Sequence, residues 1–357
     1  MEKKDMQKQK DDIRFETAMK WWEEMNETGD LGHVYGKIEE TIDRKDRKRR
    51  RRFFLRGTAA AAVLLAVVGT WLAIDNTRIG KIPTIGKISD NAVLIMSDGS
   101  QVVLDRTTEN SRVAFSDNIN VIHKQGGLVY EAQENTAVSE TTLYSTLNIP
   151  KGMIFDVVLE DGTHIWLNAD SKLHFPATFD DDERRVRLEG EGYFDVAHDA
   201  GRPFVVETPG QAVTVLGTQF NVSAYPDEQK EFTTLVEGSV SLSLPGGGSE
   251  TMLRAGQQAV LSSASGKFLV NEVDTGDISI WRAGMFSFDG HTLSEVFVML
   301  SRWYDFDYSL DSALDDIVFK GNLRVTEDVN SIFRIIERSG QVEIAARGKT
   351  IEIKMTK

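Results

Sequence analysis

Carboxylate and aromatic residues in the middle of the chain have types that suit sugar hydrolysis. Alternation along a predicted strand places Glu189, Glu191, Tyr193 and Asp195 on one face. With Trp166 they would suit a glycosidase cleft, in which two carboxylates flank one sugar ring. A solvated strand face explains the same pattern without any chemistry.

The dipeptide Gly217-Thr218 is a second candidate, because a hydroxyl directly follows a glycine in a predicted strand over 213–224. The alternation puts Thr218 on the same face as Leu216, Phe220 and Val222. If the glycine lets the backbone strain, the hydroxyl could attack the preceding carbonyl, an N→O acyl shift followed by hydrolysis. The alternative is a bulge-forming glycine followed by a buried, hydrogen-bonded threonine.

Other chemistries lack their sequence signatures. The histidines after residue 100 show no i, i+4 pair and no H-E-x-x-H, so no metal site is expected. No G-x-S-x-G elbow occurs, and the glycine run 246–248 lacks the ending of a phosphate loop. The chain has no cysteine, which rules out disulfides, a thiol nucleophile and a lipoprotein anchor. Apart from self-cleavage at Gly217-Thr218, we expect neither an enzyme nor a cofactor.

One segment organises the chain: Gly57 to Ile74 contains no charged residue and is bracketed by Arg56 and Asp75. At ~1.5 Å per helical residue it covers roughly 27 Å, close to the bilayer's hydrocarbon core. The sequence therefore predicts a single transmembrane helix over 57–74.

The flanks of this segment predict its orientation. Residues 44–52 are basic at every position except Asp46, and positive charge stays inside. Residues 1–56 hold 16 basic and 13 acidic side chains, whereas the remainder holds 25 basic and 42 acidic ones. The predicted topology is an inner-membrane protein with a cytoplasmic N-terminus and an acidic periplasmic part. That acidity argues against nucleic acid as a partner.

Residues 1–56 are predicted to form two short amphipathic helices, which together make a short helical cytoplasmic segment. Phe15, Met19 and Trp22 fall on one helical face with Trp21 beside them, and Gly29 separates this run from the second helix. So short and charged a segment buries little core, so its apolar stripe either pairs the helices loosely or docks on a partner.

A linker over 75–88 leads into residues 89–275, which predict an all-β domain. Two similar hairpins surround Asp98-Gly99 and Asp161-Gly162, the strongest local hairpin signal, and suggest an internal repeat. Further short strands follow between clusters of Gly, Pro and Asp. The expected fold is sandwich-like or a twisted solenoid.

Residues 281–357 predict a small α+β domain of βαβ-βαββ order. A T-x-x-E capping box at Thr292 begins a helix with an apolar stripe, and a second helix ends near Gly340. Strands are expected over 285–288, 307–310, 317–323, 342–346 and 351–354.

Several sequence blocks resemble FecR-like membrane-anchored anti-sigma factors. They are, in the same order as in that family, LEDGTHIWLNA (159–169), SKLHFP (171–176), LEGEGYFDVA (188–197), VLGTQFNVSAY (215–225), LVEGS (235–239) and AGQQA (255–259). Trp281 to Gly284, with Phe286, Phe288 and the RWY at 302–304, resemble the extra C-terminal domain of Bacteroidota members. That domain is similar to the short signalling domains of secretins and TonB-dependent transducers.

The resemblance implies two partners. The cytoplasmic segment would bind an extracytoplasmic-function sigma factor, with Phe15, Met19, Trp21 and Trp22 as candidate contacts. The periplasmic part would sense the signalling domain of an outer-membrane TonB-dependent transporter for an iron chelate or a glycan, with candidate contacts Phe286, Phe288, Trp303 and Tyr304. Some relatives self-cleave at a Gly-Thr that matches Gly217-Thr218.

The function expected from the sequence is thus a transmembrane anti-sigma factor that sequesters a sigma factor and releases it when a transducer docks outside. The alternative is a membrane-anchored protein that binds or cleaves envelope glycans.

Overall fold

The computed structural model describes residues 91–105, 112–116, 119–124, 127–132 and 143–356, apart from 248–249, 277, 289, 316, 327 and 348. The predicted helical segment 1–56, the membrane span 57–74 and the linker 75–88 lie outside these residues. Within the described ranges, no helix combines the length and apolarity needed to span a bilayer.

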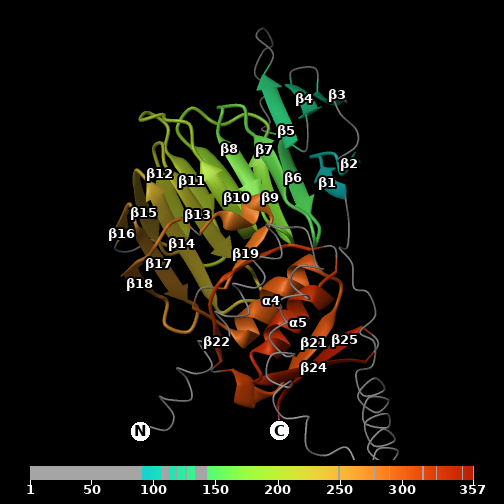
Figure 1. Ribbon diagram of the computed structural model, residues 1–357. Coiled ribbons are helices and arrows are strands. Elements are labelled where there is room, and N and C mark those ends of the chain that lie inside the picture. The colour runs from blue at the N-terminus through green and yellow to red at the C-terminus, as the bar shows by residue number, and fades with distance from the viewer. Residues whose placement is uncertain are drawn as a thin grey trace, which may run out of the picture.

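Residues 91–272 form an all-β unit, here called the β domain, in which two twisted sheets share one strand (Figure 1). In spatial order, the first sheet consists of β2 (Gln101–Asp105), β1 (Asn91–Ile95), β6 (Tyr144–Ile149), β9 (Ser171–Pro176), β10 (Arg184–Asp195), β11 (Phe204–Glu207), β12 (Ala212–Val215), β15 (Ser239–Ser243) and β16 (Thr251–Arg254). The second consists of β3 (Arg112–Ser116), β4 (Ile119–Lys124), β5 (Gly127–Ala132), β7 (Phe155–Val158), β8 (His164–Leu167), β10 again, β13 (Gln219–Ala224), β14 (Lys230–Glu237), β17 (Gln257–Ser262) and β18 (Lys267–Glu272). The predicted all-β fold is confirmed.

A single apolar core lies between the two sheets. Alternate residues of most strands point inward, so that Leu147 and Leu173 from the first sheet and Phe194 and Phe220 from the second are fully buried. The Phe194 ring stacks on Phe220 at 5.0 Å between centroids and also lies 6.4 Å from Phe204, which belongs to the first sheet. Aromatic contacts therefore join the sheets directly.

The two Asp-Gly turns have the same hydrogen bonds, as the internal repeat predicts. In the β1–β2 turn, Asp98 Oδ1 accepts from the Ser100 N–H at 2.8 Å, and in the β7–β8 turn Asp161 Oδ1 accepts from Thr163 N–H at 3.0 Å. Each glycine has a φ between 80° and 85°, a left-handed conformation that glycine adopts without steric cost. The hairpins lie in different sheets, so the repeat is local.

Strand β10 crosses from one sheet to the other at Gly190. Arg187 to Glu189 pair with β9 in the first sheet, whereas the residues from Gly190 to Asp195 pair with β13 in the second. Gly190 has φ 102°, and a Cβ there would lie 2.4 Å from Ser171 Oγ and 2.7 Å from Ser171 Cα. The predicted strand that carries Glu189, Glu191, Tyr193 and Asp195 is therefore not flat but has a corner after its first residue.

The predicted single strand over 213–224 is wrong. It divides into β12 and β13 around Leu216 to Thr218, where the chain passes from the first sheet to the second. Another corner lies beside this one at Gly238, whose φ is 97°. There β14 leads into β15. The buried positions change phase across the corner at Leu216 to Thr218: Val213 and Val215 are buried before it and Phe220 and Val222 after it, whereas Leu216 is 43% exposed.

Residues 280–356, here called the C-terminal domain, pack against one end of the β domain (Figure 1). Their elements are η1 (Ile280–Ala283), β19 (Met285–Ser287), β20 (His291–Thr292), α4 (Leu293–Trp303), β21 (Asp307–Leu310), η2 (Ser312–Leu314), β22 (Val318–Phe319), β23 (Asn322–Arg324), α5 (Asn330–Arg338), β24 (Val342–Arg347) and β25 (Thr350–Met355). The element order agrees with the predicted βαβ-βαββ, with two of the strands divided into shorter pieces.

Helix α4 begins with the predicted capping box. The Thr292 hydroxyl accepts from the Glu295 N–H at 3.3 Å, and the Glu295 carboxylate accepts from the Thr292 N–H at 2.9 Å. The apolar faces of α4 and α5 meet in a separate core, where the Phe297 and Phe333 rings stack at 5.7 Å. The two domains thus have a core each.

The corner at Gly190 gives a stability prediction. Gly190→Ala should cost about 3 kcal/mol or more, because a left-handed conformation and a clash with the Ser171 backbone combine. Gly99→Ala is the matched control: its φ is 80° but nothing lies within 4 Å of the added Cβ. It should cost about 1–2 kcal/mol. Thermal unfolding of both variants compares the losses; equal losses would contradict the role of the Gly190–Ser171 contact.

Candidate functional site at the domain junction

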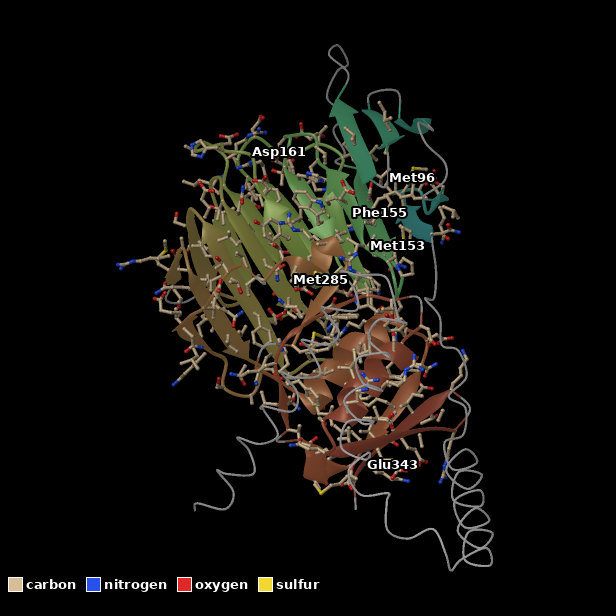
Figure 2. The ribbon with its side chains drawn as sticks, viewed as in Figure 1. Met96, Met153, Phe155, Asp161, Met285 and Glu343 are labelled. Atoms are coloured by element: carbon tan, nitrogen blue, oxygen red, sulfur yellow. The ribbon has the colours of Figure 1, made fainter. Side chains whose placement is uncertain are left out.

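The two domains meet along one end of the β domain. The Gly152 N–H donates to the Arg302 carbonyl at 2.8 Å, and Ala169 is buried in the core of the C-terminal domain, with Ile154 packed against it. Asp161 marks the opposite end of the β domain, and Glu343 lies on the far side of the C-terminal domain (Figure 2). We call the contact region between the domains the junction.

Arg302, near the end of α4, is the principal polar contact of the junction. Its Nη2 donates to Asp227 Oδ1 at 2.8 Å, and its Nη1 lies 2.9 Å from Glu228 Oε1. The guanidinium carbon lies 3.7 Å from the centroid of the Tyr225 ring. The side chain is only 5% exposed. A buried guanidinium with carboxylates and a ring face from another domain holds that domain in a defined orientation.

Arg282, in η1, makes a second contact of the same kind. Its guanidinium carbon lies 3.8 Å from the Tyr193 ring centroid and 4.7 Å from that of Trp166. Trp166 itself packs edge-on against Tyr193, with 5.9 Å between centroids. The segment that enters the C-terminal domain is therefore attached to the outer face of the second sheet.

Glu191 lies beneath the junction, next to the β10 corner. Its two carboxylate oxygens accept from the side-chain amides of Asn168 at 2.8 Å and Asn221 at 3.0 Å. Burial raises the pKa of Glu191, and the two amide hydrogen bonds and the charge of Arg302 offset only part of that effect. Burial also raises the pKa of Tyr225 and of Glu228 beside it.

The predicted glycosidase face does not form. The corner at Gly190 places Glu189 in the first sheet, where it lies 3.7 Å from Lys172, whereas Glu191, Tyr193 and Asp195 belong to the second. Glu191 is enclosed by two amides at the junction rather than directed at an open cleft with a second carboxylate. The simple alternation rule fails here because the strand changes sheets in the middle of the run.

The candidate self-cleavage dipeptide lies in the corner between β12 and β13. Thr218 is buried, and its hydroxyl donates to the Ser239 carbonyl at 3.1 Å. Gly217 has His198 against it: an added Cβ would lie 2.6 Å from His198 Nδ1 and 2.8 Å from His198 Cα. These are the features of a structural corner, in which the glycine permits close approach and the threonine satisfies a carbonyl.

The four predicted transducer contacts are not surface residues. Phe286, Phe288, Trp303 and Tyr304 are each at most 4% exposed and belong to the core of the C-terminal domain. The Tyr304 hydroxyl donates to the Thr326 carbonyl at 2.7 Å. Aromatic residues in a short domain provide its core before they provide a binding surface, so a docked partner would meet other side chains.

The histidines of the described residues do not gather around a metal site. His164 Nε2 lies 2.8 Å from Asp156 Oδ2, and His174 pairs with Thr146 and stacks on Tyr144. No group of three potential metal ligands occurs in the described ranges. The predicted sigma-binding residues Phe15, Met19, Trp21 and Trp22 lie outside them.

The roles of Arg282, Arg302 and Tyr225 were not predicted from the sequence. One signal was present in the RWY sequence at 302–304, where an arginine precedes two aromatic residues in a mainly apolar run. A charged residue in such a run is costly to bury unless it is paired. The partner segment, Tyr225 to Glu228, offers two adjacent carboxylates after an aromatic ring. Nothing in either segment by itself indicates that they meet.

Two segments of the chain match known protein families. Residues 145–241 match the family described as FecR protein, and residues 285–353 match that described as FecR, C-terminal. These two segments are FecR-like. The first match includes Trp166, Glu191 and Tyr225 of the junction, and the second includes Arg302.

Two crystal structures from Parabacteroides distasonis ATCC 8503, each described as a candidate anti-sigma factor, resemble this chain. One, at 2.50 Å resolution, is 27% identical with a TM-score of 0.56, and the match covers 60% of this chain and 100% of the other. The second, at 1.65 Å, is 28% identical with the same TM-score, covering 59% and 99%. No curated protein matches the chain.

The raised pKa of Glu191 predicts a pH dependence of stability. A carboxyl with a raised pKa in the folded state binds more protons there than in the unfolded chain. Its contribution to stability is therefore largest at or below the ordinary glutamate pKa of 4.5 and is lost as pH rises through the folded value.

Glu191→Gln should remove this loss, so that the variant gains stability relative to the wild type as pH rises above 4.5. Asn221 can turn its amide to accept from the new Nε2, since its own Oδ1 is buried without a hydrogen-bond partner. Thermal unfolding from pH 4 to 8 measures the difference. Parallel pH profiles would show that the Glu191 carboxyl is not perturbed.

The Thr218 hydrogen bond gives a prediction on self-cleavage. The purified chain should run as one band on a denaturing gel, and Thr218→Ala should lower its stability by about 1–3 kcal/mol through the unpaired Ser239 carbonyl. Thr218→Ser keeps the hydroxyl and serves as the control. Two fragments that end and begin at Gly217 and Thr218, and that disappear in Thr218→Ala, would overturn this expectation and establish the acyl shift.

Proposed function

We propose that this FecR-like protein is a transmembrane anti-sigma factor that sequesters an extracytoplasmic-function sigma factor in the cytoplasm and releases it on a signal from outside. The observation that carries the proposal is the joint match to both FecR families and to crystal structures described as candidate anti-sigma factors, over the part of the chain that follows the predicted span. The uncharged stretch 57–74 and its basic flank support an inner-membrane location.

The cytoplasmic end of the mechanism rests on the segment 1–56. Its apolar stripe with Trp21 and Trp22 is too small to form a core of its own, which supports its use as a partner surface. Binding there holds the sigma factor at the membrane, away from polymerase. A signal can shift the ratio of held to released factor only by the difference in its affinity for the two states.

The outer partner in this proposal is the signalling domain of a TonB-dependent transporter, and the C-terminal domain offers one sheet edge for it. The sheet order β21–β25–β24 makes β21 an edge strand. Asp307 and Asp311 donate their N–H groups to the β25 side, to Lys349 and Ile353, so the N–H groups of Tyr308 and Leu310 face away from the sheet. Such an edge can accept an added strand.

The opposite edge of this sheet is less accessible. On β24 the N–H of Ile344 donates to the carboxylate of Glu337 from α5 at 2.9 Å. The β21 edge is also strongly acidic, with exposed Asp305, Asp307, Asp311 and Asp315 around it. Charge and pairing therefore both favour β21 as the docking edge, for a partner strand flanked by basic residues.

Sigma binding is tested by co-purification of the full chain from its own membranes, followed by mass spectrometry. A sigma factor should be recovered with the wild type and lost with Trp21→Ala/Trp22→Ala, because the two rings supply most of the apolar contact area. Lys3→Ala/Lys4→Ala changes two charges of the same segment outside the apolar stripe and should keep the sigma factor. Equal recovery from all three chains, or none from any, would count against the proposal.

The docking edge is tested with proline substitutions. Leu310→Pro removes an N–H that faces away from β25, so the domain should fold while transporter binding falls at least tenfold. Ala346→Pro does the same at the β24 edge and should leave binding unchanged. Isothermal titration with the transporter's signalling domain measures both. Binding that is lost with Ala346→Pro but kept with Leu310→Pro would place the partner on β24 instead.

A further inference from the structure

All the groups that hold the Arg302 guanidinium come from one short segment of the β domain. Tyr225 provides a ring face at 3.7 Å, and the carboxylates of Asp227 and Glu228 each take one Nη, at 2.8 and 2.9 Å. A flat cation with two separate donor groups fits this arrangement, whereas an ammonium group has neither the plane nor the fork. The segment Tyr225 to Glu228 thus has the chemistry of a guanidinium pocket.

Contacts inside the β domain keep this pocket in shape. The Tyr225 hydroxyl donates to the Ala169 carbonyl at 2.9 Å, and the Glu228 N–H donates to the Tyr225 carbonyl at 3.0 Å. Ala169 follows Asn168, which holds Glu191 beneath the same ring. None of these bonds involves the C-terminal domain, so the Tyr225 ring and the backbone of the turn are held in place without the arginine, while the Asp227 side chain is 70% exposed.

The remainder of the junction adds few apolar contacts. Of the β-domain residues, Ala169 and Ile154 pack against the core of the C-terminal domain, and Arg282 lies on the rings of Trp166 and Tyr193. The C-terminal domain has its own core, to which the β domain adds Ala169 and Ile154. Interfaces of this type between domains of one chain resemble transient protein interfaces.

We propose that the turn from Tyr225 to Glu228 is a guanidinium-binding site that Arg302 occupies in cis, and that its occupancy decides whether the C-terminal domain is docked on the β domain. When Arg302 leaves, the C-terminal domain moves away as a folded unit and the site is open to another guanidinium group. This inference does not depend on the identity of the sigma factor or the transporter.

The test is chemical rescue of an emptied site in the full chain in detergent. Because the chain has no cysteine, spin labels can be attached at Ala264→Cys, in the exposed β17–β18 turn, and at Glu343→Cys, on β24. Pulsed electron resonance should give one narrow distance for the chain with Arg302 present. Arg302→Ala should give a broad distribution, and millimolar ethylguanidinium should restore the narrow one.

Three controls test whether the effect is specific to the pocket and to Arg302. Ethylammonium at the same concentration should not restore docking of Arg302→Ala, because it lacks the planar fork. Arg302→Met fills the pocket with an apolar chain, so ethylguanidinium should have no effect on it. Arg347→Ala removes an exposed arginine of the same domain, 74% exposed beside Glu352, and should stay docked without any addition.

A narrow distance that survives in Arg302→Ala would overturn the proposal, because docking would then not require the arginine. Equal rescue by ethylammonium would also overturn it, since the pocket would be merely acidic. If Arg302→Ala is recovered only as aggregate, refolding yield is measured with either additive instead. A higher yield with ethylguanidinium alone supports the site, and equal yields contradict it.

Discussion

The contact between Gly190 and the backbone of Ser171 is the constraint on which the arrangement of this protein depends. It lets β10 leave one sheet and continue in the other, where a side chain at position 190 would overlap Ser171. The Ser171 hydroxyl also accepts from the Glu191 N–H at 2.9 Å. One corner therefore joins the two sheets and places Glu191 and Tyr193 at the end of the β domain that receives the C-terminal domain.

The junction follows from this corner, and it brings together residues that lie far apart in the first family match. Trp166 contacts Arg282 of η1, and Tyr225 contacts Arg302 of α4. Buried arginines in contact with rings and carboxylates of another domain set orientation strongly, because separating the domains would leave these charges without their partners. Such a junction suits a protein that must respond to a partner.

The sequence predicted most individual helices, strands and turns, but it did not predict which of them contact one another. The Asp-Gly turns, the Thr292 capping box and the β-rich texture depend on neighbouring residues, so their physics is visible in the sequence. The corners at Gly190 and Gly217 and the pairing of Arg302 with the Tyr225 turn depend on residues far apart in the chain. The burial of Phe286 and Trp303 shows that aromatic residues alone do not distinguish a core from a docking surface.

Control of a sigma factor is tested most directly by measuring the transcripts of the cell. RNA sequencing would compare cells that carry the wild-type chain with cells that carry Trp22→Ala at the same protein level. With Trp22→Ala we expect a rise in one set of transcripts that share a promoter type, because the cytoplasmic segment binds its sigma factor more weakly and releases it. An unchanged transcript profile would contradict the claim and shift attention to the β domain as a binder of envelope glycans.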